Sequence, residues 1–407
     1  MIVMYLTYDG LLDPLGASQI LPYVKGIAQS QGRVVVLSFE KAAKAVAGQE
    51  QKAKEVKADG IEWKPIRFTA GYGAEGKVWD LLKMYFWAFL LAKKYSVQII
   101  HARGHTAAQV GLFLKKFSGT KLIFDFRGLW VDERVDKGGW NLSHPLHRLQ
   151  YSHFKKTERK LLQGADQIVV LTHAVVNEVV RIGAISPSKV TVIPCCADFD
   201  HFTLSTAKSR EGARMDLHIP DDALVLGYLG SVGRMYMLDR YFRFFELAAS
   251  RKKNVHALLI TQDTDILKRL MIDCLPAALH SRVHIISSSR RDLPKIIPAM
   301  DVLVSFILPS YARMAASPTK LAECFATGIP AVCNAGVGDV AETIVQLGAG
   351  VIVDPASDAD LGMAADRLIE ISAMGGSRLR DKARVLLGLE LASERYLSVY
   401  SKIESGM

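Results

Sequence analysis

The 407-residue chain lacks the cysteine patterns that hold metals or staple small secreted folds. Its five cysteines are an odd number without paired metal-ligand spacing, which indicates reduced thiols in a cytosolic compartment. The longest apolar run, residues 84–92, is far shorter than the ~18 residues that a membrane-spanning helix needs. Because the chain opens directly on a strand pattern, without a basic leader, we expect no secretion signal. These absences argue against secreted disulfide scaffolds and integral membrane proteins.

The chain also lacks several nucleotide and nucleic-acid signatures. It has no GxxxxGK motif followed by Ser or Thr, and no GxGxxG follows the first apolar run. No zinc spacing, basic heptad region or RNP-like aromatic motif is present, which argues against a nucleic-acid partner. The formal charge of +10 nevertheless favours an anionic partner, such as a nucleotide or an acidic membrane surface.

Short apolar runs alternate with helical patterns through the first half of the chain. This rhythm predicts an α/β fold with a doubly wound parallel sheet. The expected strands are 2–7, 33–39, 61–66, 99–102, 121–126, 167–171 and 190–193, and the expected helices are 16–31, 78–95, 106–117, 146–163 and 174–182. A loop-rich linker is expected at 194–220, and a second series then begins with strands 223–229, 255–261, 283–286, 302–306, 331–334 and 350–353. Ligands of such sheets bind at the carboxyl ends of strands, so we expect a cleft between the two halves.

The most informative segment runs from Ser317 to Pro330. Ser317 as N-cap, Pro318 as first helical residue and Gly328 after the last turn predict a short helix. Lys320 adds a positive charge to its phosphate-binding end, and Glu323 lies on the same face. A cation beside a carboxylate that accepts hydrogen bonds from a ribose diol suits a nucleotide sugar. The alternative is an exposed ion pair between residues three apart.

Two glycine-containing loops follow predicted strands. Gly230, Ser231 and Arg234 come after the first strand of the second half, where backbone N–H groups can approach a phosphate. The N-terminal counterpart is 13–19, which contains Gly16. The alternative for both loops is an ordinary turn between a strand and a helix.

Charged residues gather at the ends of two neighbouring strands. The segment 125–134 is expected to line the cleft, with a salt-bridged loop as the alternative. In the preceding strand, His101 is expected to be structural, whereas Arg103 and His105 are expected to be more exposed.

Two helices carry surplus basic charge. Residues 77–95 form an aromatic, apolar body with lysines at both ends, which fits either a helix on a membrane surface or a helix packed on the sheet. The basic face of 146–162 is either solvated or in contact with anionic lipid.

These motifs resemble the retaining glycosyltransferases of the GT-B fold, family 4 (glycosyltransferase group 1) type, which act in bacterial polysaccharide or lipopolysaccharide assembly. The resemblance covers nearly the whole chain. It rests on Asp9, Gly10 and 13–19; on 125–133; on Val192, Ile193 and Pro194 with Asp198 and Phe202; on Gly230 and Ser231; on 317–323; and on 336–339.

The resemblance implies two Rossmann-like doubly wound domains facing a cleft. It implies an acceptor-binding domain at 1–200, a nucleotide-sugar-binding domain at 201–388, and a C-terminal helix at 389–407 that crosses back to the first domain. The implied catalytic residues are Lys320, Arg234 and Arg127. The implied donor-binding residues are Glu323, Lys320, Ser317, Thr319, Gly230, Ser231, Arg234 and Gly16, and the implied acceptor-side residues are Asp13, Arg103, His105, Asp132 and Glu133.

Two positions depart from the family pattern. Ala315 stands where relatives carry a Glu, eight residues before Glu323, and Arg127 stands where many carry a His. An always-charged Arg127 does not suit a general base.

The implied activity is transfer of a hexose with retention from a nucleotide sugar to a saccharide or lipid-linked saccharide, without a metal or cofactor. The implied location is the cytoplasm, with peripheral association at the anionic inner membrane. Two alternatives are a nucleotide-sugar 2-epimerase of the same fold and an inactive sugar-nucleotide-binding partner, the latter prompted by Ala315.

Overall fold

The computed structural model describes residues 1–69, 71 and 73–405. The chain forms two compact units: unit 1 contains residues 1–194 and the chain from 389 onward, and unit 2 contains 195–388. The chain therefore passes from one unit to the other at 194, at the start of the expected linker and six residues before the expected boundary at 200. Among the described residues, no helix combines the length and apolar character needed to cross a bilayer.

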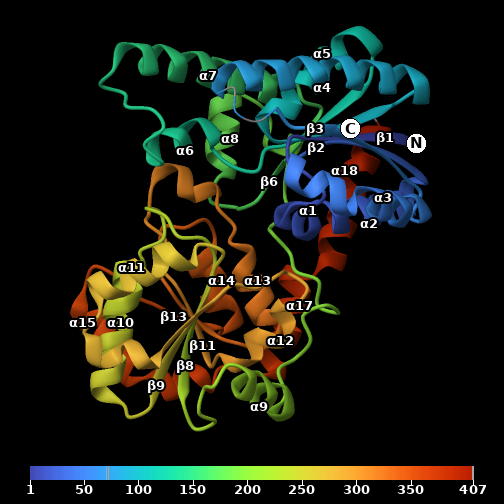
Figure 1. Cartoon of the computed structure of the whole chain (residues 1–407). Coiled ribbons are helices and arrows are strands. Elements are labelled where there is room, and N and C mark those ends of the chain that lie inside the picture. Colours follow the sequence, from blue (N-terminus) through green and yellow to red (C-terminus); the bar gives the residue numbers. More distant parts are fainter. Residues whose placement is uncertain (70, 72, 406–407) are drawn as a thin grey trace. The chain divides into compact units, whose positions relative to one another are not determined.

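Unit 1 is built on a parallel sheet, whose strands β1, β2, β3 and β6 are labelled in Figure 1. The described strands follow the order β3-β2-β1-β4-β5-β6-β7. The strands are β1 (Ile2–Thr7), β2 (Arg33–Glu40), β3 (Ile61–Arg67), β4 (Ile99–Arg103), β5 (Lys121–Asp125), β6 (Gln167–Val170) and β7 (Val190–Val192). Their bounds differ from the expected ones by at most one residue. The strand order reverses between β1 and β4, and ligands of open α/β sheets bind at such a switch point.

The helices of unit 1 flank this sheet. They are α1 (Pro14–Gln19), α2 (Leu21–Gln31), α3 (Ala42–Ala58), α4 (Gly73–Tyr95), α5 (Gly104–Ser118), α6 (Trp130–Asp136), α7 (Pro145–Gly164), α8 (Val176–Gly183) and α18 (Leu389–Glu404). The expected helix 16–31 is broken at Ile20, because Pro22 in the first turn of α2 has no N–H to continue the helix. Helices α3 and α6 were not expected. Gly26 on α2 allows α18 to approach, since a Cβ there would lie 2.7 Å from Ser393 Oγ.

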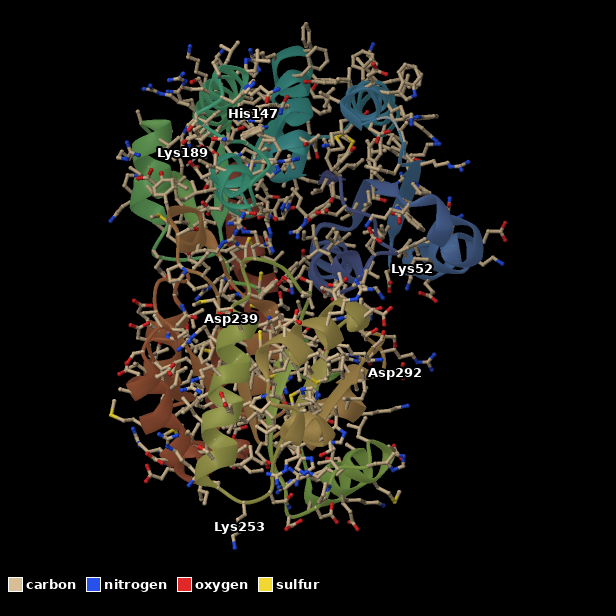
Figure 2. All side chains as sticks on the ribbon, turned by 60° about the vertical axis from the view of Figure 1, so that its left-hand side comes forward. Lys52, His147, Lys189, Asp239, Lys253 and Asp292 are labelled. Atoms are coloured by element: carbon tan, nitrogen blue, oxygen red, sulfur yellow. The ribbon has the colours of Figure 1, made fainter. Side chains whose placement is uncertain are left out.

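Unit 2 repeats the same topology. Its described parallel strands follow the order β10-β9-β8-β11-β12-β13, which reverses between β8 and β11. They are β8 (Leu224–Leu229), β9 (Val255–Ile260), β10 (Val283–Ile286), β11 (Val302–Ser305), β12 (Ala331–Cys333) and β13 (Gly350–Ile352). Figure 2 shows one charged side chain on the outside of this unit, Lys253, which extends away from the ribbon after α10 (Leu238–Arg251).

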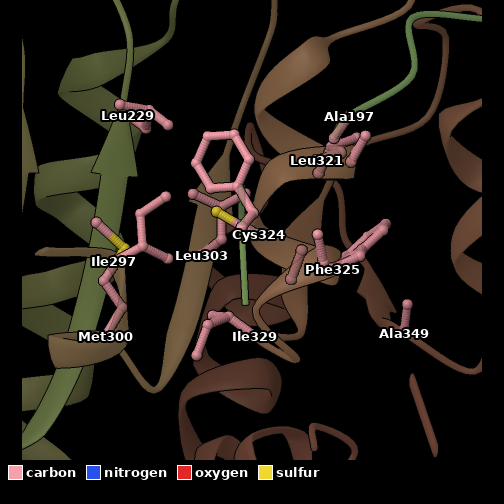
Figure 3. Close-up of a cluster of buried hydrophobic side chains, with 14 of the residues drawn as sticks. Ala197, Leu229, Ile297, Met300, Leu303, Leu321, Cys324, Phe325, Ile329 and Ala349 are labelled. Carbon is pink, nitrogen blue, oxygen red and sulfur yellow. The ribbon is translucent and has the colours of Figure 1, made fainter. Parts of the chain in front are cut away.

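The other helices of unit 2 include the segment that the sequence singled out. They are α9 (Ala207–Asp216), α11 (Thr264–Cys274), α12 (Leu293–Ile296), α13 (Thr319–Ala326), α14 (Val340–Leu347), α15 (Asp358–Asp366), α16 (Leu368–Ser372) and α17 (Ser377–Leu387). Helix α13 is anchored by Leu321, Cys324 and Phe325, which are buried in the core cluster drawn in Figure 3. This anchoring fixes the direction in which its polar residues point.

Candidate functional site

The switch point of unit 2 brings together the loop after β8 and the first turn of α13. Gly230, the residue after β8, has φ of 147°, and a Cβ at this position would lie 2.8 Å from Lys320 Nζ. The backbone conformation therefore favours glycine at this position, and the absence of a Cβ leaves room for the Lys320 ammonium. The loop after β8 and the Lys320 side chain are therefore in close contact in the structure.

The ammonium group of half-buried Lys320 has no counter-ion in hydrogen-bond reach in the part of the chain that the structure describes. Its Nζ is buried and has no hydrogen-bond partner among the described residues. The rings of Tyr228 and Tyr236 lie beneath it, with centroids 4.7 and 4.6 Å from Nζ. Burial lowers the pKa of Lys320 to about 8, and the charges of Cys324, Cys333 and Glu323 oppose this shift without cancelling it. An unpaired buried ammonium is costly, so the site favours an anionic ligand that pairs with it.

Glu323 lies on the next turn of α13 and is buried. Its carboxylate pairs with the guanidinium of Arg290, from the loop after β10. Burial raises the pKa of Glu323, and the charge of Arg290 opposes this rise. Arg290 also lies over the ring of Phe202, 5.3 Å from its centroid. Glu323 and Lys320 therefore do not form the exposed ion pair that was the alternative, because Glu323 is held by Arg290 instead.

No role was predicted for Arg290 from the sequence. Arg290 follows the carboxyl end of strand β10, where ligands of parallel sheets bind. This position is the sequence feature that could have indicated a role for Arg290 in the site. Its partner Glu323 lies 33 residues away along the chain, and local spacing could not reveal the pair.

The start of α13 differs from the expectation. The helix begins at Thr319 with Pro318 as its N-cap residue, so Pro318 is not the first helical residue and Ser317 is not the cap. The Ser317 hydroxyl instead accepts a hydrogen bond of 3.0 Å from the backbone N–H of Cys195. Ser231 offers its carbonyl to the Tyr228 hydroxyl at 2.7 Å, and Arg234 is exposed in the same loop.

A short 3-10 helix, η4 (Tyr311–Ala315), precedes α13 and contains the departure from the family pattern. Ala315 is buried, so this position presents no polar side chain. The loop is held in place by the carbonyl of Arg313, which accepts from Gly338 N–H at 2.8 Å, and by Arg313 Nη2, 2.9 Å from Met235 Sδ. Arg313 thus connects three of the loops at this edge.

The switch point of unit 1 carries a buried cluster of charged groups. Arg103 ends β4, opposite Asp125 at the end of β5. Its Nη1 lies 3.7 Å from Asp125 Oδ2, and its Nε lies 3.6 Å from Asp9 Oδ2. Within the described residues, Arg103 Nε and Nη1 and Asp125 Oδ1 have no hydrogen-bond partner. The site therefore offers both unused donors and an unused acceptor.

The final helix α18 completes this cluster. Its Tyr400 hydroxyl lies 2.7 Å from His101 Nδ1, and its Tyr396 hydroxyl donates to Asp125 Oδ2 at 3.4 Å. Burial lowers the pKa of His101, which keeps the ring neutral near pH 7. Burial raises the pKa of Asp125, but Arg127, His101 and Arg103 outweigh burial, and the net shift is downward. His101 has the structural position that the sequence predicted.

Two expectations about exposure in unit 1 are wrong. Arg103 and His105 are both buried, because β4 and α5 are covered by neighbouring elements. His105 Nε2 lies 3.0 Å from Glu158 on α7. Lys155 links this Glu158 to Asp132 on α6, at 2.5 and 3.0 Å. Asp132 and His105 are thus buried in a hydrogen-bond network that connects α5, α6 and α7.

The remaining acceptor-side and loop residues of unit 1 have local partners. Asp13 forms an ion pair of 3.0 Å with Lys41, and Glu133 forms one of 2.7 Å with Lys137. Gly16 is buried, and a Cβ at this position would lie 1.9 Å from the carbonyl oxygen of Gly10. Close packing against the backbone therefore requires glycine at position 16. Arg127 has φ of 53° and lies with Nη1 3.7 Å from Asp125 Oδ1.

Comparison with known families assigns both units. Residues 17–196 match the model described as a glycosyl transferase 4-like domain, and residues 224–370 match the model of glycosyl transferases group 1. A search of curated protein sequences finds no significant match.

Solved structures with the same fold cover nearly the whole chain. Anabaena HepE, crystallised with UDP and glucose, is similar with a TM-score of 0.70 and 16% identity over 99% of this chain and 100% of that one. WaaG, a glycosyltransferase involved in lipopolysaccharide biosynthesis, is similar with a TM-score of 0.66 and 18% identity, and the match covers 96% of this chain and 98% of WaaG. The lipopolysaccharide outer core galactosyltransferase WaaB is similar with a TM-score of 0.65 and 12% identity, and the match covers 100% of both chains.

Proposed function

Because the chain belongs to the group 1 glycosyltransferases of the family 4 type, with the GT-B fold, we propose that it transfers a hexose from a nucleotide sugar to a saccharide or lipid-linked saccharide. The transfer proceeds with retention and serves the assembly of a bacterial surface polysaccharide. The observation that carries the proposal is the buried, unpaired Lys320 ammonium beside Gly230, one helical turn from buried Glu323. HepE, which was crystallised with UDP and glucose, supports a nucleoside diphosphate as the anion.

In this proposal unit 2 binds the donor. The diphosphate accepts hydrogen bonds from Lys320, and the Glu323 carboxylate accepts from the ribose hydroxyls. Gly230 leaves room for the phosphate beside the lysine, and Arg234 reaches it from the exposed loop. As the bond between the sugar C1 and the phosphate oxygen breaks, negative charge grows on the diphosphate. Lys320 stabilises this charge more strongly in the transition state than in the ground state.

Unit 1 binds the acceptor in this proposal. A sugar hydroxyl both donates and accepts hydrogen bonds, which suits the unused donors of Arg103 and the unused acceptor of Asp125. The acceptor oxygen attacks C1 on the face that the phosphate leaves, and the departing phosphate takes the acceptor proton. Since Lys320 and the start of α13 supply positive charge, we propose that transfer needs no metal.

The lipid-linked form of the acceptor places the enzyme at the cytoplasmic surface of the inner membrane. We propose peripheral association there, driven by the basic surplus of the chain.

A panel of UDP-, GDP- and dTDP-sugars, with and without saccharide acceptors, tests the proposed reaction. We expect nucleoside diphosphate release only with an acceptor, a product of retained anomeric configuration, and no loss of rate with EDTA. Release without acceptor, together with an isomerised sugar, would identify the 2-epimerase instead. Nucleotide binding without turnover under any condition would identify an inactive binding partner.

A further inference from the structure

Helix α4 of unit 1 has an apolar face on each side. One side packs into the unit, where Met84, Ala88 and Leu91 are buried. On the other side, Val78, Trp79, Leu82, Phe86, Phe89 and Leu90 are between 38% and 59% exposed. Both interpretations of this helix from the sequence therefore have a counterpart in the structure: one face packs, and the other is left open and aromatic.

Helix α5 extends this open face. Phe113 and Phe117 on α5 are 38% and 70% exposed, and their ring centroids lie 4.6 Å apart. Phe113 also contacts Tyr85 of α4, with centroids 5.1 Å apart, which makes the two helices one continuous surface. Contiguous apolar patches of this kind mark interaction sites.

From residue 77 onward, the exposed charged side chains of α4 and α5 are basic. Between residues 77 and 118 the sequence has six lysines and one carboxylate, Asp80. Asp80 is fully buried and is used by Tyr8, Thr69 and Lys83, so it does not offset the surface charge. Lys77, Lys93, Lys94 and Lys116 are exposed around the apolar residues. A partner with a dense negative charge next to an apolar layer fits this arrangement.

A groove of about 380 Å³ borders the same face at its C-terminal end. Its lining includes Trp63, Trp87 and Leu90, with Lys64 and Lys94 as cations; the one carboxylate among the lining residues, Glu62, pairs with Arg33 at 3.4 Å. Lys64 Nζ lies 3.7 Å from the centre of a Trp87 ring. Tryptophan and lysine in one groove match the boundary of a bilayer, where anionic headgroups meet acyl chains.

We propose that the open face of α4 and α5 is a docking surface for an anionic phospholipid bilayer. The helices lie in the plane of the interface, with the aromatic residues among the acyl chains and the lysines among the headgroup phosphates. This inference deepens the proposed peripheral association and does not depend on the donor site.

Flotation of the full chain with phosphatidylcholine vesicles, with and without phosphatidylglycerol, tests the surface. We expect binding to the anionic vesicles, weakened by high salt. The double variant Trp79→Ser with Phe86→Ser should lose about 10-fold or more of this binding, because both side chains are removed from the apolar layer. The double variant Lys93→Gln with Lys94→Gln should lose about fivefold for each lysine at low salt.

A matched control uses exposed apolar residues of unit 2. The double variant Ile369→Ser with Val385→Ser removes side chains that are 67% and 71% exposed and should float like the unchanged protein. The inference is overturned if the unchanged protein does not bind anionic vesicles, or if the control loses as much binding as the α4 variant. It is also overturned if the α4 variant changes the oligomeric state but not flotation, since the face would then contact protein. Nucleotide affinity, measured in parallel, reports on the donor site separately.

Discussion

The two units share a topology, yet they balance charge differently at the switch point of the sheet. In unit 2, the buried Nζ of Lys320 has aromatic rings beneath it and no hydrogen-bond acceptor among the described residues. In unit 1, buried Arg103 lies within 3.7 Å of both Asp9 and Asp125. An uncompensated cation favours an anion, whereas a mixed set of donors and acceptors favours hydroxyl groups. Over the residues that the structure describes, the same topology thus presents a cation without a counter-ion in one unit and a mixed set of donors and acceptors in the other, which is the basis for proposing a phosphate site and a saccharide site.

This contrast predicts the largest effect for Lys320. The variant Lys320→Met should lower turnover about 10²- to 10³-fold, because a preorganised charge facing the leaving diphosphate is lost. Diphosphate release at saturating donor and acceptor measures this, with the exposed Lys253→Met as control. If donor affinity falls while turnover is unchanged, Lys320 binds the ground state and does not stabilise the transition state.

Substitutions in the charged cluster of unit 1 should weaken use of the acceptor without changing nucleotide affinity. The variant Arg103→Met should lower kcat/KM for the acceptor about 10- to 100-fold, as expected when a charged hydrogen-bond donor is removed. Nucleotide affinity, measured by calorimetry, should not change. Because Arg103 helps to keep buried Asp125 ionised, Asp9→Asn provides a second variant at a side chain that is 47% exposed. An equal loss of nucleotide affinity in both variants would contradict the division of roles between the units.

The pH dependence of nucleotide binding sharpens the contrast further. Burial lowers the pKa of Lys320 to about 8, and a bound diphosphate favours its charged form. Nucleotide affinity should therefore be constant below pH 8 and fall about tenfold per pH unit above it. Calorimetry across this range measures the effect, and Lys320→Arg, which stays charged, should remove the dependence. Without nucleotide, the unfolded chain binds more protons than the folded one above pH 8, so stability should rise with pH there.

The smallest effect is expected for Arg290, which acts through Glu323. Burial raises the pKa of Glu323 and Arg290 opposes this, so Arg290→Gln should raise that pKa further. Nucleotide affinity should fall about 3- to 10-fold, with the loss greater at lower pH and partly recovered at higher pH. Glu323→Gln is the matched control, because the nucleotide affinity of this variant should be lower but independent of pH below pH 8, where Lys320 stays charged. A pH-independent loss in Arg290→Gln would mean that Arg290 does not position Glu323 through its charge.

The sequence by itself determined the elements of both sheets and the helix that carries Lys320 and Glu323. Apolar periodicity is local, so the strands of unit 1 were predicted to within one residue. One error could have been avoided from the sequence as well. Helix 16–31 was expected to be continuous, but Pro22 indicates the break that the structure shows at Ile20. The phosphate end of the proposed donor site was predicted from a glycine after a strand and a lysine in a first turn, which are patterns of neighbouring residues, and it stays a prediction.

Only the tertiary structure decided which charges are paired and which are not. Glu323 meets Arg290 from another loop, and His101 meets Tyr400, which lies 299 residues further along the chain. Arg103 and His105 were expected to be exposed but are buried, because burial depends on the elements that pack over a strand end. A charge at the end of a strand can be read from the sequence, but its counter-ion comes from a distant segment that the fold brings into contact.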